Sequence, residues 1–328
     1  RAARARRRWA GSAAMSANAP RAWVLNLDAE SELAAARRYA PTAHLRAIVE
    51  RERARLVGSL LRPGDVLVTE EELARAPGLA AGLAGVAWSP TPTALALLRR
   101  AGARLDDAPT LEVLRSVNAR PFAAGMRAPL AGASFEKHVA TSLDGVLALL
   151  ARPAPLGWLV RRTFGAAGRG RRRIAAGRPR ADERAWLEAS LRIGPLVVEP
   201  WVEVVLEHTR SGWVARDGAV TISRPCFQKV AEHGAWLGTE RAERGALARS
   251  DDLALAAAFE AAGRALAAAG YFGPFGIDAY HHRALDGSGR AVLNPLSEIN
   301  ARFTMDWATA MSDARAPELA LERLDALA

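Results

Sequence analysis

Three polar residues near the end of the chain have the types and spacing of a metal site. Glu298 and Asn300 lie two residues apart on an expected strand, so their side chains project to the same face. Asp278 lies on the preceding expected strand, and pairing of the two strands would bring its carboxylate to that face. Two carboxylates and an amide oxygen are hard ligands of the kind that Mg²⁺ prefers, and water and phosphate oxygens complete such a shell. The open alternative is an edge strand whose polar side chains face water.

Arg302 continues this pattern two residues beyond Asn300. If the strand persists that far, the guanidinium lies beside the metal and can bind a phosphate or a carboxylate through two parallel hydrogen bonds. The neighbouring pair His281 and His282 is a weaker candidate, because adjacent strand residues face opposite sides and do not easily share one ion. We expect these two histidines to begin a solvated turn.

A glycine-rich segment follows an expected strand that ends at Arg161. It reads Phe164-Gly165-Ala166-Ala167-Gly168-Arg169-Gly170. Small residues allow backbone N–H groups to approach phosphate oxygens, and an arginine adds positive charge. The segment is not a Walker A loop, because no Gly-Lys-Ser/Thr ends it, and its spacing differs from the Rossmann fingerprint. An ordinary hairpin turn with a solvated basic flank is the alternative.

The segment Glu298-Ile299-Asn300-Ala301-Arg302, with Asp278 about twenty residues upstream, resembles the metal-binding end of ATP-grasp enzymes. It is most similar to the branch that contains biotin carboxylase and carbamoyl phosphate synthetase. This resemblance implies that Asp278, Glu298 and Asn300 bind Mg²⁺, or Mn²⁺ in its place. It also implies that Arg302 contacts the transferred phosphate or the acid substrate.

The same resemblance assigns an ATP site to other parts of the chain. The glycine segment corresponds to the phosphate lid, and Val197 to Val202 to the stretch that passes the adenine. The family's two usual lysine positions fall on Arg120 and Arg161, which keep the charge but not lysine's point contact with phosphate. Glu207 is expected near the ribose or the metal, with Glu203 as the competing choice. The implied ATP-binding residues are Arg120, Arg161, Gly165, Gly168, Arg169, Gly170, Glu199, Trp201, Val202 and Glu207, and the implied catalytic residues are Arg161 and Arg302.

The activity implied by the resemblance is an ATP-dependent ligase. Such an enzyme activates a carboxylate as an acyl phosphate, which an amine or a thiol then captures. The expected substrates are a small-molecule or peptide acid and an amine. Two other hypotheses stay open: a small-molecule kinase on the same fold, and a non-catalytic protein that binds a nucleotide or a nucleic acid. The sequence leaves the substrates and the oligomeric state undetermined.

The elements that must position these residues divide the chain into two halves. Short apolar strands alternate with helical segments over residues 15–110, which predicts a parallel α/β unit resembling a pre-ATP-grasp domain. Residues 111–328 read as an α+β ATP-grasp fold, with a glycine-loop part at about 125–202 and a metal-binding part at about 203–328. In this half, strands are expected at 158–161, 171–174, 196–199, 202–206, 273–280 and 291–300, and helices at 111–122 and 251–269.

Composition narrows the class of protein. The chain has 328 residues, half of them apolar, and a net charge of +10. Residues 1–8 supply five arginines, and we treat residues 1–14 as an extension, expected to be disordered, that precedes Met15. Nucleic acid is therefore not the expected partner. Lysine occurs only at Lys137 and Lys229, and Cys226, the single cysteine, is expected to be a buried thiol. No apolar run is long enough to span a membrane, so a cytoplasmic protein is expected.

Overall fold

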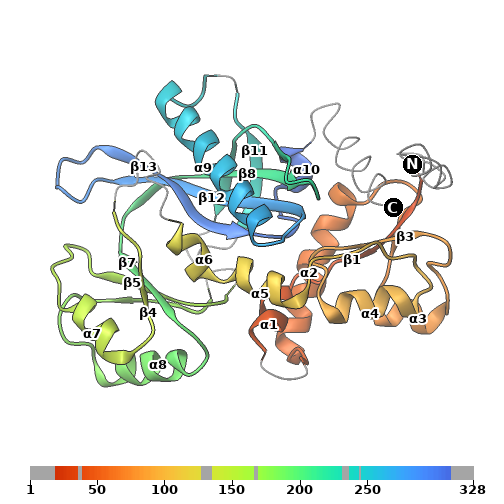
Figure 1. Ribbon diagram of the computed structural model, residues 1–328, viewed down its shortest axis with the longest axis horizontal. Coiled ribbons are helices and arrows are strands. Elements are labelled where there is room, and N and C mark those ends of the chain that lie inside the picture. The colour runs from red at the N-terminus through yellow and green to blue at the C-terminus, as the bar shows by residue number, and fades with distance from the viewer. Residues whose placement is uncertain are drawn as a thin grey trace, which may run out of the picture.

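Three β-sheets with helices packed against them make up the described part of the chain (Figure 1). The computed structural model describes residues 19–35, 39–126, 135–165, 169–230, 236–243 and 245–311. The expected N-terminal extension at 1–14, and Gly168 of the glycine segment, lie outside these residues. No helix among the described residues is both long and apolar enough to cross a membrane.

The first sheet is parallel and has the strand order β2-β1-β3. Its elements are β1 (Arg21–Val24), α1 (Ala29–Ala34), α2 (Ala43–Leu60), β2 (Val66–Leu67), α3 (Glu70–Arg75), β3 (Ala84–Ala87) and α4 (Pro92–Arg100). The central strand β1 is buried along its whole length, as expected when helices cover a parallel sheet. The parallel pairing predicted from the alternation of strands and helices is confirmed.

The second sheet is antiparallel, with the order β4-β7-β5-β6. It follows two connecting helices, and the elements are α5 (Leu111–Asn118), α6 (Arg120–Gly125), β4 (His138–Ala140), α7 (Leu143–Leu150), β5 (Trp158–Arg162), β6 (Arg171–Ile174), α8 (Ala181–Leu191) and β7 (Leu196–Pro200). Val160, Ile174 and Leu187 pack in one apolar cluster between this sheet and its helices. The strands β5 and β6 pair across the glycine segment, so the predicted strand–loop–strand hairpin is confirmed.

The third sheet has the order β11-β10-β8-β12-β13, and β9 pairs with β8. Its elements are β8 (Val204–Val214), β9 (Val220–Ile222), β10 (Cys226–Val230), β11 (Trp236–Arg241), α9 (Arg249–Ala268), β12 (Gly273–Arg283), β13 (Ala291–Asn300) and α10 (Trp307–Ala310). Helix α9 covers one face of this sheet. A Cβ at Gly212 would lie 2.7 Å from the Phe259 ring, so glycine is needed there for the helix to pack this closely.

Two features of this half differ from the prediction. The expected strand at 202–206 begins at Val204 and runs on to Val214, and β4 and β9–β11 had no clear sequence signal. Strands this short or this exposed lack the apolar alternation on which a sequence prediction depends. Figure 1 shows helix α6 between the second and third sheets, and it contacts β7 on one side and β13 on the other. The surface between these two sheets carries the predicted site.

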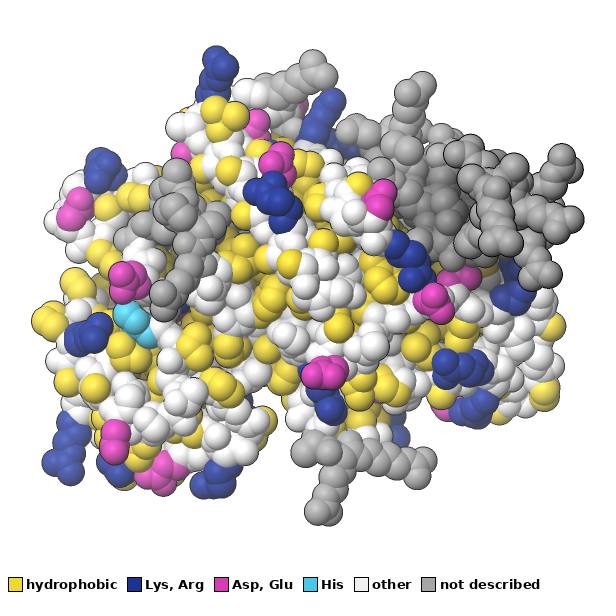
Figure 2. Space-filling model, viewed as in Figure 1, with side chains coloured by type: hydrophobic (Ala, Val, Ile, Leu, Met, Phe, Trp, Pro, Cys, Tyr) yellow, Lys and Arg dark blue, Asp and Glu magenta, His cyan; other side chains and the backbone are white. Residues whose placement is uncertain are grey.

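The charged side chains on one face of the protein are dispersed. On the face drawn in Figure 2, lysine and arginine side chains alternate with acidic and apolar ones and do not merge into one basic surface. This face therefore lacks the continuous positive stripe that is typical of nucleic-acid-binding proteins.

Candidate active site

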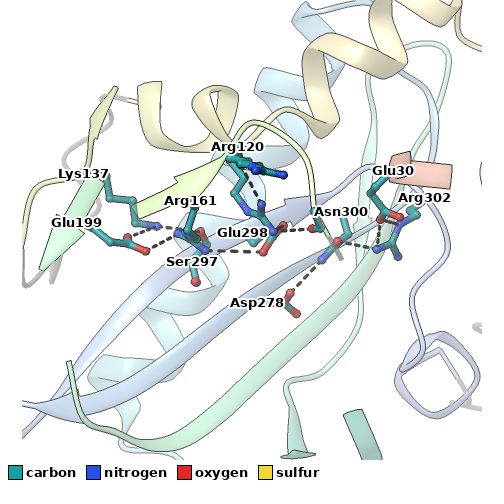
Figure 3. A network of polar contacts seen from close by, with 12 residues as sticks. Glu30, Arg120, Lys137, Arg161, Glu199, Asp278, Ser297, Glu298, Asn300 and Arg302 are labelled. Carbon is teal, nitrogen blue, oxygen red and sulfur yellow. Dashed lines mark hydrogen bonds and ion pairs between the residues drawn. The ribbon is translucent and has the colours of Figure 1, made fainter. Parts of the chain in front are cut away.

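The structure brings the three predicted metal ligands together on one face of the third sheet. Asp278 on β12 is the direct cross-strand partner of Glu298 on β13, and residues that lie opposite each other share a face. The Asn300 Nδ2 donates to the Asp278 Oδ2 at 3.0 Å (Figure 3). The turn that joins β12 and β13 makes this proximity possible, as the sequence suggested. Their role as metal ligands remains a prediction.

Arg302 reaches the same cluster by a different route from the one expected. The strand ends at Asn300, as predicted, and the Arg302 N–H donates to the Asn300 carbonyl in a turn, so the condition that the strand persists to Arg302 is not met. The side chain nevertheless returns to the site, and its Nη2 donates to the Asn300 Oδ1 at 3.0 Å. The guanidinium also forms an ion pair with Glu30 of α1. Arg302 therefore connects the predicted metal site to helix α1 (Figure 3).

Two buried arginines face Glu298 from the other side of the site. The Arg120 Nη2 lies 3.2 Å from the Glu298 Oε1, and the Arg161 Nη1 lies 3.8 Å from its Oε2. Arg161 also pairs with Glu199 at 2.6 Å. Figure 3 shows the resulting row, in which positive and negative side chains alternate between the two sheets. The two arginines predicted to stand in for lysines thus flank the central predicted ligand.

The two carboxylates of the site have opposite electrostatic environments. Burial raises the pKa of Asp278 to about 7, and the neighbouring negative charges of Glu298 and Asp306 add to the shift. Burial would also raise the pKa of Glu298, but the charges of Arg120 and Arg161 outweigh it and hold that pKa below its usual range. Near neutral pH, Glu298 is therefore an anion, whereas Asp278 is poised between its two protonation states.

The glycine hairpin is attached to this row of charges through Arg120. The Arg120 Nη1 donates to the Arg162 carbonyl at 3.0 Å, and its Nη2 donates to the Gly165 carbonyl at 2.5 Å. A Cβ at Gly165 would lie 2.5 Å from the Arg169 carbonyl oxygen, and Gly170 has a φ of +71°. Both positions therefore require glycine. Arg169 is exposed at the tip of the hairpin.

The predicted adenine-side residues line the junction between β7 and β8. Glu199 is 1% exposed, and its side chain is occupied by Arg161. The Trp201 N–H donates to the Gly157 carbonyl at 2.8 Å, and the Arg173 guanidinium lies 5.1 Å from the Trp201 ring centre. Val202 is buried. These contacts make Glu199 an anchor for the arginine more than a free hydrogen-bond acceptor.

The structure separates the two candidates for the ribose-side carboxylate. Glu207 on β8 is the cross-strand partner of Tyr280 on β12 and so shares the face of Asp278, two residues before Tyr280. Burial raises the pKa of Glu207. Glu203 precedes β8 and is exposed. Glu207 therefore has the better position for the proposed role.

Sequence reasoning missed Lys137, which lies just before β4. Its side chain is 11% exposed, and its Nζ donates to the Leu296 and Ser297 carbonyls at 2.7 and 2.9 Å. The Nζ also lies 3.8 Å from the Glu199 Oε2. Burial lowers the pKa of Lys137 to about 8, against the opposing pull of Glu199. The available signal was its rarity, because the chain has only one other lysine.

A second buried acid, Asp306, lies beyond the metal-site residues. It is 2% exposed, and it accepts hydrogen bonds from Gln228 at 2.9 Å, from Trp236 at 3.2 Å and from Thr239. The same Gln228 amide lies 3.3 Å from the Asp278 Oδ1. Gln228 thus links Asp306 to the predicted ligand set.

The prediction of a solvated turn at His281 and His282 is wrong. Both belong to β12, and His282 is fully buried. On the α9 side of the sheet, the His281 Nδ1 lies 2.7 Å from the His208 Nε2, and the His281 Nε2 lies 2.9 Å from Asp251. The two histidines do face opposite sides of the strand. Cys226 is buried, as expected.

Among the residues that the structure describes, several buried polar atoms between the two sheets lack a hydrogen-bond partner. They are the Nε atoms of Arg120 and Arg161, the Glu199 Oε2 and the Asn294 Nδ2. Buried polar groups are normally satisfied, so these atoms fit a site that a polar ligand completes. The described residues contain no group of three or more His, Cys, Asp or Glu side chains arranged for a metal. Asp278, Glu298 and Asn300 offer two carboxylates and an amide, and Mg²⁺ is usually held by one or two carboxylates together with phosphate oxygens and water.

Comparison with solved structures identifies the fold. Biotin carboxylase from Campylobacter jejuni, in a β,γ-ATP complex, has a TM-score of 0.55 at 11% identity, over 93% of this chain and 71% of the other. The chain has the ATP-grasp fold. N5-carboxyaminoimidazole ribonucleotide synthetase from Thermus thermophilus has a TM-score of 0.51 at 17% identity, and the match covers 91% of this chain and 76% of the other. Pyruvate carboxylase from Rhizobium etli has a TM-score of 0.52 at 15% identity, and the match covers 94% of this chain and 28% of the other.

Sequence comparison adds no family assignment. No protein-family profile matches the chain, and no curated protein matches it in sequence. At identities between 11% and 17%, the structural likeness establishes the fold alone. The chemistry has to be argued from this chain's own residues.

Proposed function

We propose that this protein is an ATP-dependent ligase that joins a carboxylate to an amine through an acyl phosphate. The observation that carries the proposal is the shared face on which Asp278, Glu298 and Asn300 meet Arg120 and Arg161. Oxygen atoms that can bind a metal lie beside buried cations in this site, and that combination suits a polyphosphate. The site lies within an ATP-grasp fold. The solved biotin carboxylase with this fold is itself a β,γ-ATP complex.

Each part of the site has a task in this proposal. Asp278, Glu298 and Asn300 would hold Mg²⁺, and rotation of the Asn300 amide would turn its oxygen toward Asp278. The ion would neutralise phosphate charge and so lower the barrier to transfer. Arg120 and Arg161 supply buried positive charge for the phosphates, and Arg120 holds the glycine hairpin in place through its bond to Gly165.

The reaction needs positioned charge more than a side-chain nucleophile. A substrate carboxylate oxygen forms a bond to the γ-phosphorus while the bond to the β,γ-bridging oxygen breaks, which releases ADP. An amine then attacks the acyl carbon, phosphate leaves, and the nitrogen loses one proton. In both steps the protein contributes orientation and electrostatic stabilisation. Arg302 would contact the transferred phosphate or the acid, close to Glu30 of α1.

The N-terminal part of the chain would contribute to substrate binding. We take residues 15–110 as a pre-ATP-grasp unit and 111–328 as the ATP-grasp part, and the Arg302–Glu30 pair lies where the two meet. The substrates proposed are small acids and amines, with peptides included.

A screen for ADP release tests the proposal. Pools of amino acids and small peptides are incubated with ATP and Mg²⁺, and active pools are analysed by mass spectrometry. A ligase releases ADP and phosphate only when both an acid and an amine are present. Glu298→Gln is expected to reduce turnover by about 100-fold or more, because it removes an anionic metal ligand. ADP release without free phosphate would identify a kinase, and the absence of nucleotide binding would overturn the proposal.

A further inference from the structure

The strand that carries Glu298 is irregular just before that residue. The cross-strand pairs of β13 with β12 are Tyr280 with Asn294 and Asp278 with Glu298. One residue of β12, Ala279, therefore faces residues 295–297 of β13, which have no partner on β12. Such a bulge changes the direction of the strand and of the side chain that follows it. The position of Glu298 thus depends on how this bulge is held.

Lys137 holds it. The Nζ donates to both the Leu296 and Ser297 carbonyls, which are two of the three residues in the bulge. β13 is the edge strand of its sheet, so a second strand does not supply these hydrogen bonds. The Arg161 Nη2 makes a longer contact of 3.4 Å with the Ser297 carbonyl, but Lys137 provides the short bonds.

Two donors of Lys137 form hydrogen bonds within the protein. An ammonium group has three N–H donors. Two are directed to the bulge, and the third faces Glu199, whose Oε2 lies 3.8 Å from the Nζ. The Nζ is therefore directed mainly to the bulge. Lys137 directly precedes β4 of the glycine-hairpin sheet, so its side chain ties that sheet to the strand that carries Glu298 (Figure 3).

We propose that Lys137 is a positioning residue, which fixes the bulge at residues 295–297 and thereby aims Glu298 at the metal. This inference rests on the proposed function, since it assigns Glu298 to the metal. Residues that orient a metal ligand without touching the metal commonly change metal affinity by about 10–100-fold when they are replaced. Loss of Lys137 is therefore expected to weaken metal binding selectively and to affect metal-free nucleotide binding little.

The test compares binding in four forms of the full-length protein: the wild type, Lys137→Met, Lys137→Arg and Lys229→Met. Mn²⁺ affinity is measured by electron paramagnetic resonance in the presence of a non-hydrolysable ATP analogue. Affinity for a fluorescent ATP analogue is measured in EDTA, and thermal unfolding reports on the fold. Lys229 is the matched control, because it is the other lysine and its side chain is 67% exposed beside Glu240.

Lys137→Met is expected to lower Mn²⁺ affinity by about tenfold or more, with nucleotide affinity in EDTA changed by less than about twofold. Lys137→Arg can still donate to both carbonyls and is expected to recover most of the Mn²⁺ affinity. Lys229→Met should match the wild type. If Lys137→Met does not fold, Lys137→Gln provides the comparison, because its shorter amide cannot replace both bonds.

Two results would overturn the inference. Equal losses of affinity with and without metal would show that Lys137 contacts the nucleotide or merely supports the fold. An unchanged Mn²⁺ affinity in Lys137→Met would show that the bulge does not depend on it. Failure of the proposed function gives a different result, because the wild type itself would then show no metal-dependent nucleotide binding.

Discussion

Arg161→Met removes the buried cation that joins Glu199 to Glu298. The Arg161 side chain is 8% exposed and that of Glu199 is 1% exposed, with 2.6 Å between them. Removing one partner from such a pair typically costs about 3–5 kcal/mol, because the remaining charge stays buried. Lys137 remains 3.8 Å from the other Glu199 oxygen, so we expect the loss to lie near the lower limit, at about 3 kcal/mol.

Chemical and thermal unfolding measure this loss. An unfolding entropy of about 2.1 cal/mol/K per residue gives about 0.7 kcal/mol/K for 328 residues. A loss of about 3 kcal/mol therefore lowers the melting temperature by about 4 °C. Urea unfolding followed by tryptophan fluorescence should give the same free-energy difference, since Trp158 lies on the same strand as Arg161.

The matched control is Arg172→Met on the adjacent strand β6. Arg172 pairs with Asp182 at 3.2 Å, but both side chains are well exposed, so its loss should cost less than about 1 kcal/mol. The double variant Arg161→Met with Glu199→Leu should recover at least half of the lost stability, because it leaves no unpaired buried carboxylate. A double variant no more stable than Arg161→Met alone would refute the argument that buried charge causes the loss.

Two further predictions concern the hairpin and the opposite face of the third sheet. Gly165→Ala places a Cβ 2.5 Å from the Arg169 carbonyl oxygen, so the backbone of the hairpin has to shift. We expect fluorescent-nucleotide binding to weaken by about tenfold, a cost of about 1.4 kcal/mol; unchanged binding would show that the hairpin does not contact the nucleotide. Burial lowers the pKa of His208 to about 4, and His281 adds to the shift, so protonation favours the unfolded state. The stability that neutral His208 contributes is therefore complete above about pH 6.5 and is lost as the pH falls toward 4. Urea unfolding at pH 7 and pH 4.5 should show a smaller decline for His208→Asn than for the wild type, and equal declines would contradict this assignment.

The sequence was informative for those site residues that lie close together in the chain. Asp278, Glu298 and Asn300 belong to one hairpin, so strand alternation and a recognisable turn were enough to place them on a common face. The glycine hairpin between β5 and β6 was predictable for the same reason. The parallel N-terminal sheet followed from the alternation of strand and helix patterns.

The contacts that were missed join distant parts of the chain. Lys137 and Ser297 are 160 positions apart, and Arg302 and Glu30 are 272 positions apart. No periodic pattern within a single segment encodes such pairs. His281 was misjudged for a related reason, because its partners His208 and Asp251 come from another strand and from a helix. Polar residues in a strand are predicted to be exposed to solvent when the helix or strand that covers them is not known.

The charges of the site neutralise one another in the structure. Glu298, the central predicted metal ligand, pairs with Arg120 and Arg161, the two cations assigned to the phosphates. Under the proposed function, Mg²⁺ must therefore compete with two arginines for Glu298, and phosphate must compete with Glu298 for the arginines. A Mg²⁺–nucleotide complex removes both conflicts at once, because the metal takes Glu298 while the phosphates take the arginines. The internal ion pairs that keep these buried charges satisfied also favour joint over separate binding of metal and nucleotide.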